Sequence, residues 1–323
     1  MRGLGALAAA AWCVGIGLTA VHAQGYPDRP IKVVVPYVPG SPPDVLARVV
    51  TQQASARLPQ SMIVENRPGA GTTLGMKAVA AAAPDGYTLL LSGQGLAYMR
   101  MLYPDLGFEP SKAFVPVATL ATWSHVLVVA PSVPAKTVQE LVAYAKANPG
   151  KLTFGFGLGT VPQILGEYFK AVAAIDIASI PYRGGEQVRV DLLGGRIAMN
   201  IGPISNVLGL IQQGKVRPLA VTYPTRHPVL PDLPTMRESG YPQVGFDPDV
   251  WQGFFAPAGT PETVINKLNA ELNESIASPA AKAAFERLGF ESKITSPQEH
   301  AAFIASELKK WPPIIEASGV KPQ

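Results

Sequence analysis

The chain has 323 residues, with 27 lysines and arginines against 23 aspartates and glutamates, so its formal net charge at neutral pH is +4. This mild balance, without basic runs interleaved with aromatic residues, argues against nucleic acid as a partner. No apolar run beyond residue 23 reaches the roughly 20 residues that a membrane-spanning helix needs. The composition favours a globular protein with a slight preference for anionic partners.

The N-terminal segment has the pattern of a secretory signal peptide. It has a short charged start, an apolar run over residues 4–20 and the small-residue ending Val-His-Ala at 21–23. The alternative, a membrane anchor, is disfavoured because the run is short and interrupted by glycines. We expect residues 1–23 to be removed, leaving 300 residues (323 − 23) that work outside the cytoplasm. The only cysteine, Cys13, goes with them, so no disulfide is expected.

Along the mature chain, short β-branched runs alternate with segments in which apolar residues recur at helical spacing. Continuous apolar strands separated by helices are typical of parallel sheets covered on both faces, so the predicted fold class is α/β. Up to residue 222 the predicted strands are 31–36, 61–65, 87–92, 125–130, 151–155, 178–182, 196–201 and 216–222, and the predicted helices are 44–58, 72–83, 137–148, 161–174, 187–193 and 205–213.

Regular structure is predicted to stop between residues 224 and 248, where prolines recur. We interpret this stretch as a packed connector because it holds aromatic and apolar residues; the alternative is a disordered linker. A strand at 251–256 and helices at 262–276, 280–288 and 298–317 follow.

The order of elements predicts two lobes joined by a hinge of two crossings. The chain leaves a first α/β unit near residue 123, builds a second up to about residue 222, and returns to complete the first. We therefore expect one lobe from residues 24–123 and 223–323 and another from 124–222, each a mostly parallel sheet flanked by helices.

Two strand-to-helix loops are candidates for ligand binding, because ligands of open parallel sheets bind beyond the carboxyl ends of the strands, near helix N-termini. In the loop at 36–44, Gly40 allows close approach, Ser41 offers a hydroxyl, and Asp44 either contacts a ligand or only caps its helix. In the loop at 154–160, three glycines and Thr160 favour a cradle for a carboxylate.

Nucleotide and catalytic motifs are not matched. Thr160 and Pro162 stand where a dinucleotide fingerprint would need its third glycine, and Ala145 stands where a P-loop would need its first. The mature chain has no thiol, no G-x-S-x-G elbow and no H-E-x-x-H helix. We therefore expect that the protein is not an enzyme. Of the three histidines in the mature chain, His125 is predicted to be structural, and His227 and His300 are predicted to be solvated.

Seven stretches stand out in chain order: Tyr26–Ile31, Val64–Gly71, Ala83–Leu90, Lys136–Leu141, Ile180–Gly185, Gly214–Thr222 and Leu230–Thr235. Together they resemble the Bug-type (TctC-like) solute receptors of tripartite tricarboxylate transporters, over the whole mature chain. The resemblance implies a two-lobe periplasmic binding protein of type II-like fold. It further implies a monomer, without metal or cofactor, that closes on a small organic carboxylate and delivers it to integral membrane transporter subunits.

The resemblance also implies which residues bind the ligand. They are Tyr37, Gly40, Ser41, Asp44, Ser92, Phe156, Gly157, Gly159, Thr160, Gly184 and Ser205.

The chain departs from the family pattern at some of these positions. The family usually has two glycines where Gly40 and Ser41 stand, and a hydroxyl residue is common at the position of Phe156. Aromatic surface from Tyr37, Phe156 and Trp251 favours an aromatic or bulky apolar acid, unless Phe156 is packed in the lobe core. Two alternatives remain open, a sensing subunit that presents the bound acid to a signalling partner and an exported hydrolase.

Overall fold

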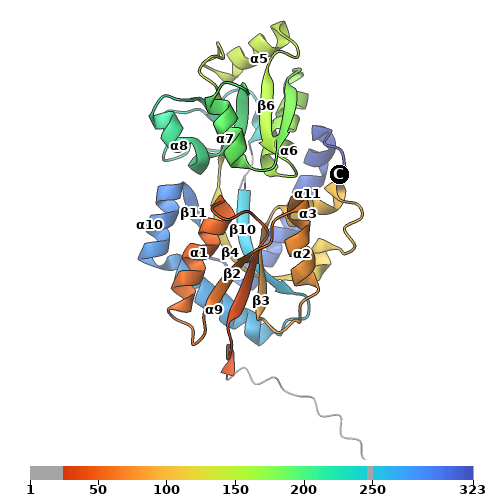
Figure 1. Cartoon of the computed structure of the whole chain (residues 1–323), viewed down its shortest axis with the longest axis vertical. Helices are drawn as coiled ribbons and strands as arrows, with labels where there is room; N and C mark the ends of the chain where they lie inside the picture. The colour runs from red at the N-terminus through yellow and green to blue at the C-terminus, as the bar shows by residue number, and fades with distance from the viewer. Residues whose placement is uncertain (1–24, 246–249, 323) are drawn as a thin grey trace, which may run out of the picture.

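The computed structural model describes residues 25–245 and 250–322. The signal peptide expected at 1–23 lies outside these ranges. Figure 1 shows the described chain as two bodies stacked along its longest axis, each a sheet flanked by helices. This arrangement is the two-lobe α/β fold class expected from the sequence. Among the helices that the structure describes, none is both long and apolar enough to cross a bilayer.

Lobe one, as we call the lower body in Figure 1, contains a six-stranded sheet in the order β11-β4-β10-β3-β1-β2. Its strands are β1 (Ile31–Val35), β2 (Met62–Asn66), β3 (Thr88–Gly93), β4 (Phe114–Trp123), β10 (Val250–Pro257) and β11 (Phe290–Ser292). Its helices are α1 (Pro42–Ser55), the 3-10 turn η2 (Ala70–Thr72), α2 (Thr73–Ala80), α3 (Gly95–Leu102), α4 (Pro110–Ala113), α9 (Glu262–Ala277), α10 (Pro279–Leu288) and α11 (Pro297–Ser318).

Lobe two contains a five-stranded sheet in the order β7-β6-β8-β5-β9. Its strands are β5 (His125–Val129), β6 (Thr153–Gly157), β7 (Ala178–Tyr182), β8 (Met199–Pro203) and β9 (Arg217–Val221). Its helices are α5 (Val138–Ala147), α6 (Val161–Ala173), α7 (Gly185–Leu193) and α8 (Ile204–Gln212). Every residue of β5 is buried, as expected for a strand covered on both faces.

The sheets are mixed: most strands of each sheet run in the same direction, as expected, but each sheet contains an internal reversed strand that was not expected. β1 pairs in parallel with β2 and β3, and β6 pairs in parallel with β7 and β8. By contrast, β10 and β5 are antiparallel to both of their neighbours. The reason is the crossing between lobes, because β5 and β10 are each the first strand after the chain changes lobe. Each starts at the edge that faces the other lobe and must run away from it.

Besides the four-residue helix α4, three elements of lobe one have no counterpart in the sequence prediction. β11 has only three residues and is held by its antiparallel pairing with β4. β4 carries a proline at position 116, a residue that is rare inside strands. α3 begins with glycine, a poor helix former. In each case tertiary packing outweighs the local signal.

The connector after β9 is packed against lobe two. Met236 and Val244 are fully buried, and the Met236 N–H donates to the Val221 carbonyl at 2.8 Å. Tyr241 meets Phe169 of α6 edge to face, with 5.3 Å between ring centroids. The described part of this stretch is therefore a folded connector, and the alternative of a disordered linker is wrong for it.

The expectation that His227 and His300 are solvated is wrong, because both are buried. His300 lies against the rings of Trp251 and Phe255, at centroid distances of 6.1 Å and 5.0 Å. A Cβ added at Gly253 would come 2.5 Å from its ring, so only glycine fits beside it. Neither ring nitrogen has a hydrogen-bond partner among the described residues. Burial lowers the pKa of His300 from 6.5 to about 3.

This burial makes stability depend on pH. Between about pH 6.5 and pH 3 the unfolded chain binds a proton at His300 that the folded protein does not, so stability falls as the pH falls through this window. Within this window each pH unit lowers the free energy of unfolding by about 1.4 kcal/mol. When the pH is lowered from 7 to 5, the free energy of unfolding measured in urea should therefore fall by about 2 kcal/mol more in the native chain than in a His300→Phe variant. Equal losses in the two proteins would mean that His300 is not buried in its neutral form.

Candidate ligand site between the lobes

The carboxyl ends of the parallel strands lie at the edges where the two lobes adjoin. Trp123, the last residue of β4, pairs with Val250 at the start of β10. His125, the first residue of β5, pairs with Pro203 at the end of β8. The loops that follow β1, β3, β6, β7 and β8 therefore lie at these edges, and every ligand residue expected from the sequence lies in one of them or at an adjoining strand or helix end.

Asp44 organises the loop between β1 and α1. Its side chain is 2% exposed and accepts hydrogen bonds from the Gly40 N–H (2.8 Å), Asn66 Nδ2 (2.8 Å) and Arg48 Nε (3.0 Å). Asn66 also donates to the Tyr37 carbonyl at 3.0 Å. Burial acts to raise the pKa of Asp44, but the hydrogen bonds from Arg48, Gly40 and Asn66 outweigh it and hold this pKa below its usual value. These contacts favour a structural role for Asp44.

The N-terminus of α1 has few backbone donors left for an anion. Pro42 and Pro43 occupy the first two helical positions and have no N–H. Ser41 directs both its N–H and its hydroxyl to the Val38 carbonyl, at 3.2 Å and 2.7 Å. The Asp44 carboxylate adds a negative charge in the first turn, which opposes a bound anion. Gly40, at φ +80°, supplies the left-handed turn that this loop needs.

Tyr37 is joined to Gln252, a residue that the sequence analysis missed. The phenol oxygen of Tyr37 accepts a hydrogen bond from Gln252 Nε2 at 3.1 Å. Gln252 lies on β10 opposite Gly93 of β3, next to Ser92, and is 2% exposed. A Cβ at Gly93 would lie 2.8 Å from Gln252 Nε2, so the glycine makes room for the amide. No motif marks Gln252, because its place follows from the antiparallel return of β10.

The glycine-rich loop after β6 uses the donors of Gly159 and Thr160 internally. The Gly159 N–H donates to Gln163 Oε1 at 2.8 Å, and the Thr160 hydroxyl donates to the Gly157 carbonyl at 2.6 Å. Phe156 is 3% exposed and packs against Phe154 with 5.1 Å between centroids. This packing favours the alternative that Phe156 belongs to the lobe core.

The starts of α7 and α8 lie side by side and carry no side-chain cap. α7 begins after Gly184 and α8 after Pro203, and neither residue caps its helix through a side chain. A Cβ at Gly185 would lie 3.4 Å from the Asn206 amide of α8, which places the two helix starts next to each other. The Ser205 hydroxyl is buried without a hydrogen-bond partner among the described residues.

A missing side-chain cap is common in this molecule and does not by itself set α7 and α8 apart. Side chains of Thr137, Ser278 and Ser296 cap α5, α10 and α11, whereas α1, α2, α3, α4, α6 and α9 also begin without one. Free N–H groups and the positive end of a helix dipole favour anions. Glu186 adds a carboxylate to the first turn of α7, but it is exposed and paired with Arg189, and the first N–H of α8, that of Ile204, donates to the Ser124 carbonyl. The paired starts of α7 and α8 favour an anion because they lie next to each other and lack the prolines that remove donors at α1.

Trp251 is fully buried and does not supply aromatic surface to the site. Its indole N–H donates to Glu307 of α11 at 2.7 Å, and the Trp311 indole donates to the same oxygen at 2.9 Å. Glu307 is itself 2% exposed and forms an ion pair with Lys310. Of the three aromatic residues expected at the site, only Tyr37 is more than slightly exposed.

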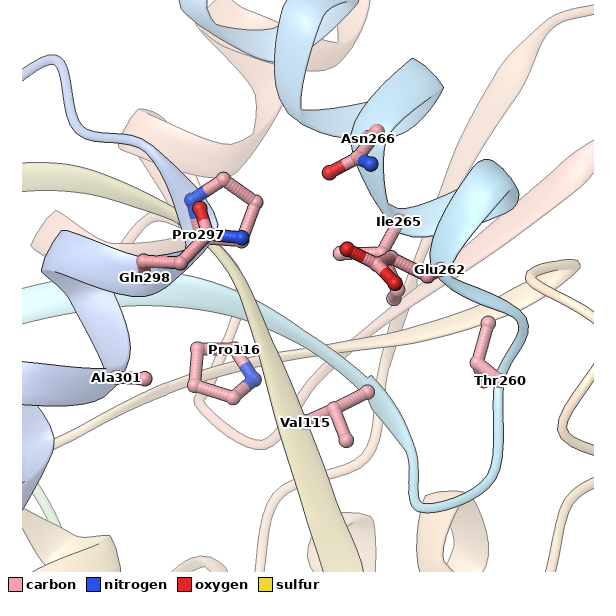
Figure 2. Close-up of a pocket in the computed structure, with 9 residues that line it drawn as sticks. All are labelled: Val115, Pro116, Thr260, Glu262, Ile265, Asn266, Pro297, Gln298 and Ala301. Atoms are coloured by element: carbon pink, nitrogen blue, oxygen red, sulfur yellow. The ribbon is translucent and has the colours of Figure 1, made fainter.

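A surface cavity of about 270 Å³ lies at the opposite edge of lobe one (Figure 2). Val115 and Pro116, at the start of β4, form its floor, and Glu262 and Gln298 of α9 and α11 flank it. The cavity is thus separated from the interlobe edge by the length of β4. Within residues 25–245 and 250–322, no three His, Cys, Asp or Glu side chains gather as metal ligands would.

Comparison with known proteins agrees with this architecture. The model of the tripartite tricarboxylate transporter family receptor matches residues 46–320. The chain belongs to this family. It is 37% identical to protein BugT of Bordetella pertussis over 304 residues, which cover 93% of each chain.

Solved structures of related receptors superpose over most of the chain. A protein of R. palustris, solved with adipate, has 31% identity and a TM-score of 0.85, and the match covers 92% of this chain and all of that one. MatC of Rhodopseudomonas palustris, solved with bound malate, has 30% identity and a TM-score of 0.82, over 90% of this chain and all of that one. The chain is therefore similar throughout to solute-binding receptors.

The Asp44 contacts predict a measurable loss of stability on substitution. An Asp44→Asn variant keeps the shape of the side chain but turns an N–H group toward the donors of Arg48, Asn66 or Gly40, so the free energy of unfolding in urea should fall by about 2 kcal/mol. The matched control is Asp105→Asn, at an exposed position, which should change it by less than about 0.5 kcal/mol. Equal stability of the two variants would contradict the structural role of Asp44.

Proposed function

We propose that this protein is a periplasmic receptor that binds a small carboxylate between its two lobes and delivers it to the membrane subunits of a tripartite tricarboxylate-type transporter. The observation that carries the proposal is the pair of uncapped, adjacent helix starts of α7 and α8, with the unpartnered Ser205 hydroxyl beside them. The adipate and malate in the two related structures support the same ligand class. The signal-peptide pattern at 1–23 supports the periplasmic location.

In this proposal the lobes are residues 24–123 with 223–323, and 124–222, except that the connector described up to residue 245 belongs with lobe two, against which it packs. The two crossings act as the hinge. A ligand that touches both lobes does so fully only when they close, so its binding energy shifts the population toward the closed state. Lobe two supplies donors to the carboxylate from the starts of α7 and α8. Lobe one supplies the loop held by Asp44 and the Tyr37–Gln252 pair, whose polar atoms meet the rest of the ligand.

A Gly184→Asp variant tests where the carboxylate binds. Gly184 has extended backbone at φ −170° and no atom within 4 Å of an added Cβ, so a side chain fits there without strain. An aspartate at this N-cap would bond the free N–H groups of α7 and repel a carboxylate. The affinity for adipate or malate, whichever binds the native chain more tightly by calorimetry, should fall about 10-fold or more, which corresponds to about 1.4 kcal/mol, without loss of stability.

The matched control is Thr137→Asp, which places the same charge at the N-cap of α5. Because α5 follows the reversed strand β5, its start lies at the opposite edge of lobe two. This variant should bind the same acid within about 2-fold of the native chain. Equal affinities of the two variants would contradict a site at α7, and no binding of either acid or of a wider panel of carboxylates would contradict the proposed function itself.

A further inference from the structure

The lobe-one half of the site contains a buried acceptor that the protein leaves unpaired. Gln252 is 2% exposed, and its Oε1 has no hydrogen-bond partner among the described residues. Its Nε2 is used, because it donates to the Tyr37 phenol oxygen at 3.1 Å. A buried acceptor without a partner costs free energy, so a structural role alone gives no reason for an amide at this position.

Tyr37 provides a hydrogen-bond donor next to this acceptor. Its oxygen accepts from Gln252, which leaves the phenol hydrogen to be donated elsewhere. Burial raises the pKa of Tyr37 above its usual value, so the phenol keeps this hydrogen at neutral pH. The two side chains together present one O–H donor and one carbonyl acceptor, which is the pattern that a hydroxyl group complements.

The charges around the pair fit a neutral group and not a second carboxylate. Asp44 lies in the first turn of α1, directly after the loop that contains Tyr37. Arg48, one turn further along α1, is already bonded to Asp44 and to Asn66 Oδ1. The two prolines at the start of α1 remove backbone donors that a carboxylate would need. A neutral hydroxyl meets none of these obstacles.

We infer that Gln252 and Tyr37 form a specificity pair that binds a hydroxyl group of the ligand, so that the receptor prefers hydroxy-carboxylates to the corresponding unsubstituted acids. The inference rests on the proposed function and divides the ligand between the lobes: the carboxylate at the starts of α7 and α8, the hydroxyl at Gln252 and Tyr37. Since Gln252 Oε1 is covered in this structure, the hydroxyl reaches it through a movement of the Tyr37 loop or an opening of the lobes. A ligand without the hydroxyl leaves the acceptor unpaired, which is how such sites discriminate.

Calorimetric titration with matched acids tests this preference. The pairs are butyrate with 3-hydroxybutyrate, succinate with malate, and glutarate with 2-hydroxyglutarate, and oxaloacetate is added as the keto counterpart of malate. In the pair that binds most tightly, the hydroxy acid should bind about 10-fold or more tightly than the unsubstituted acid. In Gln252→Met and in Tyr37→Phe the ratio should fall to within about 2-fold, chiefly through weaker binding of the hydroxy acid.

Two controls separate recognition from folding. Gln139→Met removes an amide of the same type on α5, which donates to the Ser239 carbonyl at 2.9 Å outside the site, and it should keep the native ratio. Gln252→Met removes a buried unpaired acceptor, which stabilises, together with the hydrogen bond to Tyr37, which destabilises, so its unfolding midpoint in urea should stay close to that of the native chain.

The possible results have distinct meanings. Equal binding of each acid and its hydroxy counterpart to the native chain, or a ratio that survives in both variants, would overturn the inference while leaving the proposed function intact; a water molecule that satisfies Gln252 would produce this result. Tighter binding of oxaloacetate than of malate would show that the amide presents its N–H group to the ligand and would overturn it as well. If none of the seven acids binds while adipate or another unsubstituted carboxylate does, the inference is overturned and the proposed function stands. If adipate and the wider panel of carboxylates also fail to bind, the proposed function itself fails.

Discussion

The antiparallel pairing of β4 with β10 is the constraint on which the rest of the structure depends. The chain leaves lobe one along β4 and returns along β10, and the two strands pair from Val250–Trp123 to Pro257–Phe114. This double connection fixes the direction of β10, inserts it between β3 and β4, and so brings Trp251 to Glu307 and Gln252 to Tyr37. The same connection leaves the lobes joined at one edge, where the carboxyl ends of the parallel strands lie, so hinge and site share a single region of the fold.

The two lobes make unequal contributions to this region. Lobe two presents adjacent helix starts at α7 and α8 whose N–H groups have no side-chain cap. In lobe one the start of α1 is closed by two prolines and by Asp44, whose carboxylate is bonded to its own loop, while the start of α3 is uncapped but single. The adjacent pair of helix starts therefore lies in lobe two. Lobe one offers the neutral polar atoms of Tyr37 and Gln252, and this division underlies both the proposed carboxylate site and the proposed preference for a hydroxyl group.

Much of the fold could be predicted from the sequence, because β-branched runs such as β5 and periodic helices such as α6 carry strong local signals. The pairing of β10 could not, since strand direction depends on the path of the whole chain and not on the residues of the strand. The candidate loops could also be predicted, but the contacts that their side chains and backbone groups make within the protein could not. Gly159 is bonded to Gln163, Phe156 packs on Phe154, and Gln252 meets Tyr37 across 215 positions of sequence. Burial of His300 has the same origin, because the polar sequence around it gives no sign of the ring cluster that tertiary packing builds.

Identification of the bound molecule tests the central claim most directly. The protein would be purified from cells that express it with its own N-terminus, weighed by native mass spectrometry, and then denatured so that any released molecule can be identified. A small carboxylate bound in a one-to-one ratio, and lost from Gly184→Asp prepared in the same way, is the result that the account predicts. A stoichiometric ligand that is neutral or cationic would contradict it, because such a ligand has no carboxylate for the starts of α7 and α8 to bind.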